Sequence, residues 1–217
     1  MADFTLYIGN KNYSSWSLRG WLALKATEAP FEEVLIKLRE PNTRTEVLRH
    51  SPSGRVPALK HGEITVWESL AIGEYLAERF PKAKLWPGDI GARAVARAVS
   101  TEMHAGFQAL RTHFPMNFRS SFPNRGSTPE VQADINRITA IWHDCRKRFG
   151  ATGPFLFGTF TVADAMYAPV VSRFRTYKVE LDAETQAYCD AVWAWPAMQE
   201  WAAAAKNEPW VIEDSEF

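Results

Sequence analysis

The stretch that carries most of the information about the fold lies at residues 4–24 and reads FTLYIGNKNYSSWSLRGWLAL. Its first five residues alternate and are rich in β-formers, which predicts a strand. A polar run breaks this pattern, and apolar side chains then recur at helical spacing over residues 16–24. Ser14 or Ser15 can cap the start of this helix, and Pro30 marks its end. The chain therefore begins with a strand, a loop and a helix.

Further strands and helices follow at short intervals. Apolar runs bounded by turn residues predict three more strands, at residues 32–37, 56–60 and 63–66. Helical spacing predicts a short helix at 43–50 and a longer one that starts at Glu68 and ends before residue 81. The order strand, helix, strand, helix, strand, strand, helix predicts an α/β module.

The second part of the chain has a different composition. Residues 81–91 hold two prolines and two glycines, which is typical of an interdomain linker. Every later pattern is helical, and we predict helices at about 91–114, 129–149, 162–175, 183–193 and 196–205. We therefore expect an α/β domain over residues 1–81, a linker over 82–91 and an all-α domain over 92–217.

Charge and composition exclude several classes of protein. The 217 residues include 25 Lys and Arg against 25 Asp and Glu, so the formal net charge is zero. Nonspecific binding to nucleic acid needs an excess of basic residues, and binding to a membrane surface needs a basic face. The cysteines, Cys145 and Cys189, lack the spacing of a metal site, and no apolar run is long enough to span a membrane. We expect a cytoplasmic protein that needs no metal or disulfide, and neither nucleic acid nor a membrane as partner.

Three serines, Ser14, Ser15 and Ser17, lie at the predicted start of the first helix. Ligands of open α/β sheets bind where the carboxyl end of a strand meets the following helix, because the helix N-terminus offers free N–H groups and a partial positive charge. A serine hydroxyl there can donate a hydrogen bond to a bound anion, or it can simply cap the helix. The spacing leaves both interpretations open.

Two pairs of residues suit a peptide-like ligand. A cis bond at Val56–Pro57 would free the backbone N–H and C=O of Val56 to pair with an extended ligand, whereas a trans bond would make a plain turn. Glu68 and Ser69 begin a predicted helix, where the acid can hold an ammonium group and the hydroxyl a carboxylate. The alternative is again a helix cap with a favourable charge.

A fourth motif, Gly158 to Asp164, is structural. Thr161 and Asp164 have the spacing of a capping box, so we expect them to start a buried helix. The motifs GxSxG, GxGxxG, the P-loop and HExxH are absent from the sequence, which excludes the enzyme classes that depend on them.

Taken in this order, the segments resemble the cytosolic glutathione transferase superfamily over nearly the whole chain. Ser-Ser-Trp-Ser-Leu-Arg at 14–19 is similar to the Ser-Ser-Cys-Ser-x-Arg motif of the zeta class. Val56–Pro57 is similar to the cis-proline step of the family, and Glu68–Ser69 to its pair of an acid or Gln and a serine. Gly158 to Asp164 resembles its capping motif. The resemblance implies a thioredoxin-like first domain and an all-helical second one.

The resemblance also implies a reaction. A serine hydroxyl of the family donates to the sulfur of glutathione, the co-substrate, and Ser14 matches that position, although Ser15 and Ser17 are close enough to leave the assignment open. Lowering a thiol pKa by about two units from ~8.5 requires roughly 2.7 kcal/mol, within reach of one hydroxyl and a helix N-terminus. The residues implied to bind glutathione are Arg55, Val56, Pro57, Glu68 and Ser69.

The second substrate is expected between the domains. The resemblance implies an electrophile site with Trp16, Met103, His104, Phe107 and Arg111, in which Arg111 would suit an acidic acceptor. Core packing is the alternative for Met103 and Phe107, and a surface charge for Arg111. Trp16 stands where the zeta motif has cysteine, and a serine cannot form a mixed disulfide, so thiol exchange is disfavoured.

These implications leave three hypotheses for the function. The first is a glutathione transferase that conjugates small electrophiles, as in detoxification. The second is a zeta-type isomerase or a glutathione-dependent dehalogenase, and the third is a non-catalytic binding or scaffold protein of the same fold. A homodimer is expected from the resemblance alone.

Overall fold

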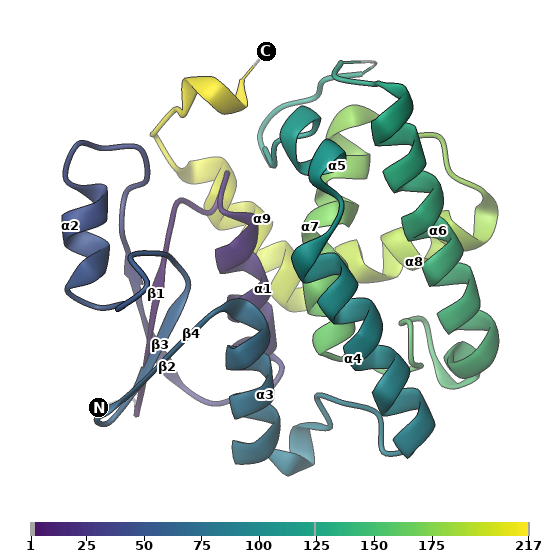
Figure 1. Cartoon of the computed structure of the whole chain (residues 1–217), viewed down its shortest axis with the longest axis horizontal. Helices are drawn as coiled ribbons and strands as arrows, with labels where there is room; N and C mark the ends of the chain where they lie inside the picture. The colour runs from purple at the N-terminus through teal and green to yellow at the C-terminus, as the bar shows by residue number, and fades with distance from the viewer. Residues whose placement is uncertain (1–2, 124, 217) are drawn as a thin grey trace.

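The computed structural model describes residues 3–123 and 125–216, which form a half with a sheet and a helical half (Figure 1). The first half holds four strands in the order β2-β1-β3-β4, with β1 parallel to β2 and antiparallel to β3, and β3 antiparallel to β4. Its elements are β1 (Phe4–Ile8), α1 (Ser15–Lys25), β2 (Phe31–Leu35), α2 (Thr43–Leu48), β3 (Ala58–His61), β4 (Ile64–Trp67) and α3 (Ser69–Arg79). The predicted order of strands and helices is confirmed.

The alternation that predicted the first strand decides which face of the sheet is buried. Leu6 and Ile8 of β1 are fully buried and belong to the same core as Leu22 of α1 and Ile72 of α3. On the other face, Tyr7 stacks on His50, just after α2, with ring centroids 4.1 Å apart. The helices α1 and α3 therefore lie between the sheet and the helical half, and α2 lies on the far side (Figure 1).

The second half is helical, as predicted. Its helices are α4 (Ile90–Ala105), α5 (Gln108–His113), α6 (Pro129–Phe149), α7 (Val162–Tyr177), α8 (Ala183–Ala194) and α9 (Pro196–Asn207), with short 3-10 turns at Pro81–Ala83, Gly150–Thr152 and Glu213–Ser215. The helix α7 is buried along almost its whole length and packs against α1, α4 and α8. Thr161 and Asp164 form the predicted capping box at its start. No helix within the described ranges is long and apolar enough to cross a membrane.

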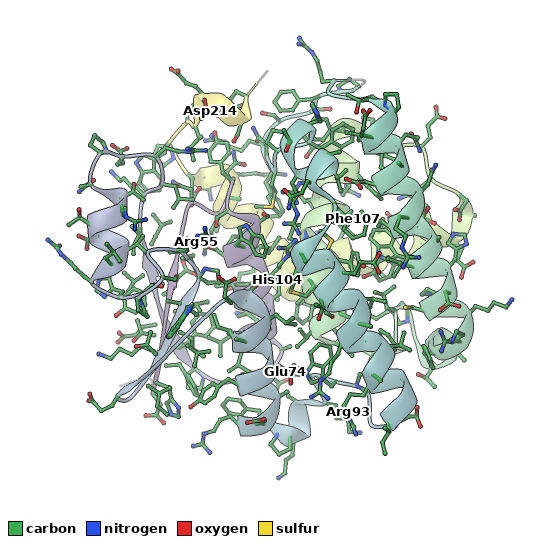
Figure 2. All side chains as sticks on the ribbon, viewed as in Figure 1. Arg55, Glu74, Arg93, His104, Phe107 and Asp214 are labelled. Carbon is green, nitrogen blue, oxygen red and sulfur yellow. The ribbon has the colours of Figure 1, made fainter. Side chains whose placement is uncertain are left out.

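The predicted helix at 91–114 is wrong in its extent, because two helices occupy that range. Gly106 is extended and Phe107 takes a left-handed conformation with φ of 61°, which ends α4 before α5 begins (Phe107 is labelled in Figure 2). The guanidinium group of Arg111 donates to the carbonyls of Met103, His104 and Gly106, which are left unpaired at the end of a helix. No local sequence pattern predicts this contact, because Arg111 lies in α5 and the carbonyls lie at the end of α4.

Two glycines allow close packing, one within the first half and one between the two halves. A Cβ atom on Gly20 of α1 would lie 3.0 Å from Cγ of Pro57, and one on Gly73 of α3 would lie 2.9 Å from Cγ1 of Val162 at the start of α7. Since real Cβ contacts are rarely that short, a small residue is required at both positions. The middle of α1 thereby packs closely against Pro57, which leads into β3 beside the candidate site.

Candidate functional site

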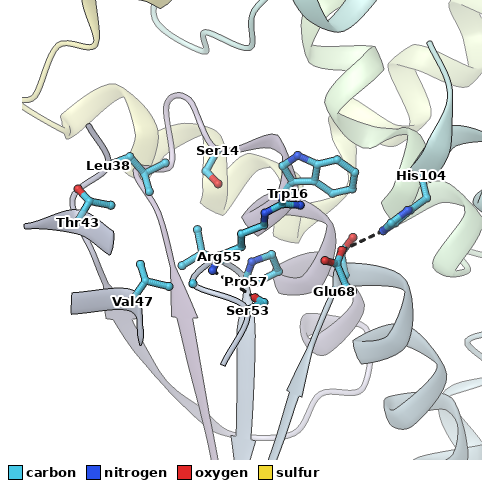
Figure 3. Close-up of a pocket in the computed structure, with 13 residues that line it drawn as sticks. Ser14, Trp16, Leu38, Thr43, Val47, Ser53, Arg55, Pro57, Glu68 and His104 are labelled. Atoms are coloured by element: carbon cyan, nitrogen blue, oxygen red, sulfur yellow. Dashed lines mark hydrogen bonds and ion pairs between the residues drawn. The ribbon is translucent and has the colours of Figure 1, made fainter. Parts of the chain in front are cut away.

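A cavity of about 490 Å³ lies where α1, the residues before β3, the start of α3 and the end of α4 meet (Figure 3). Its size is that of a typical small-molecule site. Both halves of the chain contribute to it, the second through His104. The residues that line it are Ser14, Trp16, Leu38, Thr43, Val47, Ser53, Gly54, Arg55, Val56, Pro57, Glu68, Ser69 and His104.

Of the three candidate serines, Ser14 lines this cavity, whereas Ser15 and Ser17 are not part of the lining. Ser14 is the N-cap of α1, and its Oγ accepts a hydrogen bond from the backbone N–H of Ser17 at 3.3 Å. The Ser14 hydroxyl in turn donates to Oγ of Ser17 at 2.8 Å. Ser17 is fully buried, and its Oγ accepts from the backbone N–H of Gly9 at 2.9 Å. Ser17 therefore supports Ser14 from inside the protein.

The Val56–Pro57 bond is cis. Pairing between β1 and β3 starts with Tyr7 and Ala58, so Val56 lies outside the ladder and at the cavity wall. The preceding turn is held by a hydrogen bond from the backbone N–H of Arg55 to Oγ of Ser53 at 3.2 Å. The Arg55 side chain is exposed on the side of the sheet (Figures 2 and 3).

Glu68 and Ser69 stand at the start of α3, as predicted. Glu68 has φ of 68° and ψ of 124°, a conformation that L-residues rarely adopt and that is often found at functional sites. Its Oε2 lies 3.1 Å from Nε2 of His104, so the two halves of the chain meet across the cavity at this pair (dashed line in Figure 3). Ser69 is 2% exposed, and the contact of its hydroxyl among the described residues is to a sulfur atom, Sδ of Met166, at 3.9 Å. Its backbone and hydroxyl donors can serve a ligand.

The residues predicted for the electrophile are divided by the structure. Trp16 and His104 line the cavity, and their rings are in edge contact with centroids 5.0 Å apart. Met103 and Phe107 are buried in the core, and Arg111 lies behind Trp16 with its Cζ 4.8 Å from the ring centroid. A direct contact of these last three with an electrophile stays a prediction.

Sequence reasoning missed part of the wall. Leu38, Thr43, Val47, Ser53 and Gly54 line the same cavity. Leu38 and Thr43 follow β2, whose carboxyl end lies beside that of β1 because the two strands are parallel. This juxtaposition was available from the predicted strand order, since the carboxyl ends of parallel strands share one edge. In the described part of the chain, no group of three or more His, Cys, Asp or Glu residues is placed to hold a metal ion.

Comparison with known families gives two matches. The family model "Glutathione S-transferase, N-terminal domain" matches residues 13–79, and "Glutathione S-transferase, C-terminal domain" matches residues 93–204. The maleylacetoacetate isomerase of Rattus norvegicus is 31% identical over 179 residues, which cover 81% of this chain and 80% of that protein. Glutathione S-transferase 1 of Dianthus caryophyllus is 33% identical over 153 residues, 70% of this chain and 65% of that protein.

Solved structures share the fold. A glutathione transferase homolog from Burkholderia GL BGR1 with bound glutathione superposes with a TM-score of 0.72, at 24% identity, over 96% of this chain and all of that one. A theta class glutathione S-transferase from Xanthomonas axonopodis pv. citri with glutathione bound gives a TM-score of 0.68 at 18% identity, over 93% of this chain and 98% of that one. The thioredoxin-like half and the helical half therefore have the arrangement of this fold.

Proposed function

Because the chain belongs to the glutathione S-transferase family, we propose that it binds glutathione in the cavity of Figure 3 and activates the thiol with the Ser14 hydroxyl for attack on a small electrophile. The observation that carries this proposal is the position of Ser14. Its hydroxyl lies at the N-terminus of α1 and at the cavity wall, with a second hydroxyl, that of Ser17, bonded behind it.

The sheet side of the cavity suits the constant parts of glutathione, which are an ammonium group, two carboxylates and peptide amides. Glu68 offers a negative charge for the ammonium, and the N-terminus of α3 with the Ser69 hydroxyl suits the neighbouring carboxylate. The backbone of Val56, next to Pro57 and outside the ladder, can pair with the central peptide unit. The guanidinium of Arg55 at the rim suits the terminal carboxylate.

In the proposed mechanism Ser14 and Ser17 act in series. In the structure the Ser14 hydroxyl donates to Oγ of Ser17, which also accepts from the backbone N–H of Gly9. When glutathione binds, the Ser14 hydroxyl turns its proton to the thiolate, and the Ser17 hydroxyl then turns to donate to Oγ of Ser14. The thiol proton is lost to solvent, and the partial positive charge at the start of α1 adds to the stabilisation of the anion. The sulfur then forms a bond to an electrophilic carbon. Either that carbon expels a leaving group with its electron pair, or the π electrons of its double bond move to the far end, which takes up a proton from solvent.

A conjugation assay with glutathione and chlorodinitrobenzene tests this proposal. The wild-type protein is expected to form the thioether faster than the uncatalysed reaction, and Ser14→Ala is expected to abolish most of that acceleration. A protein that binds glutathione but accelerates no conjugation would support the non-catalytic reading instead.

The identity to maleylacetoacetate isomerases favours a second candidate, a glutathione-dependent isomerase. This reaction uses the same thiolate, which adds to a double bond, allows rotation and is expelled again. Supplying maleylacetone in place of chlorodinitrobenzene tests it, because isomerisation consumes no glutathione whereas conjugation does. Trp16 takes the position of the cysteine in the zeta motif, which favours conjugation over isomerisation.

We also propose that the protein is a homodimer. This proposal rests on membership of the glutathione S-transferase family, whose cytosolic members are usually dimers. Light scattering coupled to size exclusion is expected to give about twice the chain mass of 24.6 kDa. A mass of one chain at micromolar concentration would contradict it.

A further inference from the structure

The indole ring of Trp16 rests on two guanidinium groups. Cζ of Arg19 lies 4.4 Å from the ring centroid, and Cζ of Arg111 lies 4.8 Å from it. The ring is partly exposed, and it reaches the cavity beside His104 (Figure 3). Trp16 therefore separates the cavity from a basic region of the interior.

That region is a cluster of three arginines, Arg19, Arg111 and Arg173, which we name the arginine cluster. Every hydrogen-bond acceptor that the structure describes for these guanidinium groups is a backbone carbonyl. Burial lowers the pKa of Arg19, and repulsion from the other two adds to this effect. The carboxylate of Asp134 favours the charged form of Arg111. The hydrogen bond that the structure describes for this carboxylate comes from the backbone N–H of Leu110 and not from a guanidinium group. The cluster is short of negative charge.

Arg19 is the least satisfied member. It is 1% exposed, and its Nε donates to the carbonyl of Met166 at 3.0 Å. Its Nη1 and Nη2 atoms are buried and have no hydrogen-bond partner among the described residues. The face of the Trp16 ring is the group that meets this cation, since an aromatic face attracts a guanidinium.

We propose that Trp16 determines the class of electrophile by covering the arginine cluster, so that the site takes uncharged acceptors with a flat face and rejects acceptors that carry a carboxylate. The assumption that an acceptor binds beside Ser14 rests on the proposed function. The observation that the Trp16 ring covers the arginines is independent of that function. A smaller side chain at position 16 would uncover the Nη donors of Arg19 and the side of Arg111. A planar pair of donors is suited to a carboxylate, so removal of the ring should turn rejection into preference.

A pair of unreactive probes with nearly the same shape tests this proposal. We would measure equilibrium binding of nitrobenzoate and nitrobenzamide, which differ in charge, to the whole protein. The ratio of their affinities is expected to shift toward nitrobenzoate by about tenfold or more in Trp16→Ala, and by less than about threefold in Trp16→Phe, which keeps an aromatic face. The gain is expected to fall in Trp16→Ala with Arg111→Gln, which removes one of the two uncovered guanidinium groups, and to persist unchanged in Trp16→Ala with Arg55→Gln.

The chain offers a matched control in Trp193, whose ring centroid lies 4.2 Å from Cζ of Arg175 outside the cavity. Trp193→Ala removes the same kind of pair and should leave the ratio unchanged. A ratio that stays the same in Trp16→Ala, or that shifts equally in Trp193→Ala, would overturn the proposal. So would a gain that depends on Arg55. If circular dichroism shows that Trp16→Ala does not fold, Trp16→Leu keeps apolar bulk without the aromatic face and should shift the ratio in the same direction.

The binding ratio is independent of turnover, so the two proposals can fail separately. Wild-type protein that fails to conjugate any electrophile would contradict the proposed function, while the probe ratio would still decide the role of Trp16. Wild-type protein that conjugates chlorodinitrobenzene, with no change of the ratio in Trp16→Ala, would leave the function standing and remove the inference.

Discussion

The two walls of the cavity are built in different ways. The wall on the sheet side consists of Val56, Pro57 and the start of α3, where backbone groups and short side chains are held by strand pairing and helix ends. The opposite wall consists of the side chains of Trp16 and His104, whose rings are in contact, and the Trp16 ring is supported by Arg19 of its own helix and by Arg111 of α5. A wall of backbone groups suits a constant ligand, and a wall of long side chains can change from one protein to the next. Under the proposed function, this difference would separate recognition of glutathione from choice of the electrophile.

The largest effect is expected where the two walls meet, at Ser14. Ser14→Ala should lower kcat by about 100- to 1000-fold, as the loss of one donor to a reacting anion does, and should change the KM for glutathione by less than about threefold. Steady-state kinetics with chlorodinitrobenzene checks this. Ser15→Ala is the matched control, because Ser15 is the neighbouring serine and is not part of the lining. Equal losses in the two variants would mean that the hydroxyl at the wall has no special role.

On the sheet wall, substitution should act on binding and not on turnover. Ser69→Ala is expected to raise the KM for glutathione about tenfold, because a buried hydrogen bond to a charged group is lost, and to change kcat by less than about threefold. Ser100→Ala is a suitable control, since its buried hydroxyl donates to the carbonyl of Ala96 within α4. A Ser69→Ala variant that lost turnover at an unchanged KM would break the division between the walls.

The residues of the sheet-side wall could be predicted from the sequence more completely than those of the opposite wall. Ser14, Val56–Pro57 and Glu68–Ser69 were identified from sequence because strand ends, helix starts and X-Pro steps are encoded by neighbouring residues. Leu38 and Thr43 were missed, although the parallel pairing of β1 and β2 brings them to the same edge. Those sheet-wall residues follow from local rules or from topology.

The helical wall followed from sequence only in part. Trp16 and Arg19 are three residues apart on α1, so their contact follows from helical geometry, although it was not predicted from the sequence. Arg111 reaches Trp16 from α5 because the chain breaks at Phe107, and no local pattern predicted that break. Contacts between distant helices are decided by packing, which the order of apolar residues constrains only loosely.

The two walls keep their relative places because α1 packs against α7, whose start depends on Asp164. This carboxylate is fully buried and accepts from the backbone N–H groups of Leu156 and Thr161 and from the hydroxyl of Tyr188. Burial raises the pKa of Asp164 to about 6 from the usual 3.8, in spite of these hydrogen bonds. The folded protein therefore holds this proton more tightly than the unfolded chain does.

The stability that Asp164 contributes is accordingly complete below pH 3.8 and is lost as the pH rises through about 6. From pH 8 to pH 5, the advantage of the wild type over Asp164→Asn in free energy of unfolding should grow by about 1 kcal/mol. Urea unfolding at the two pH values measures it. An advantage that shrinks toward pH 5 would show that the carboxylate is ionised in the folded state.

The smallest effect is expected at Glu68, where function and stability should move in opposite directions. Glu68→Gly removes the strain of a positive φ and should stabilise the fold by about 1 kcal/mol, although the loss of the carboxylate raises the KM for glutathione. Glu68→Gln keeps the strained positive φ and removes only the negative charge. Thermal unfolding measures the stability of both variants. A lower unfolding temperature for Glu68→Gly than for Glu68→Gln would contradict the account.

The most direct test of the central claim is the ultraviolet thiolate absorbance of glutathione bound to the protein, titrated with pH for the wild type and for Ser14→Ala. If the Ser14 hydroxyl at the N-terminus of α1 stabilises the anion, the wild type should hold a thiolate signal below pH 7, and Ser14→Ala should bind glutathione and lose that signal. A bound thiol that titrates in the wild type as it does free in solution would contradict the account.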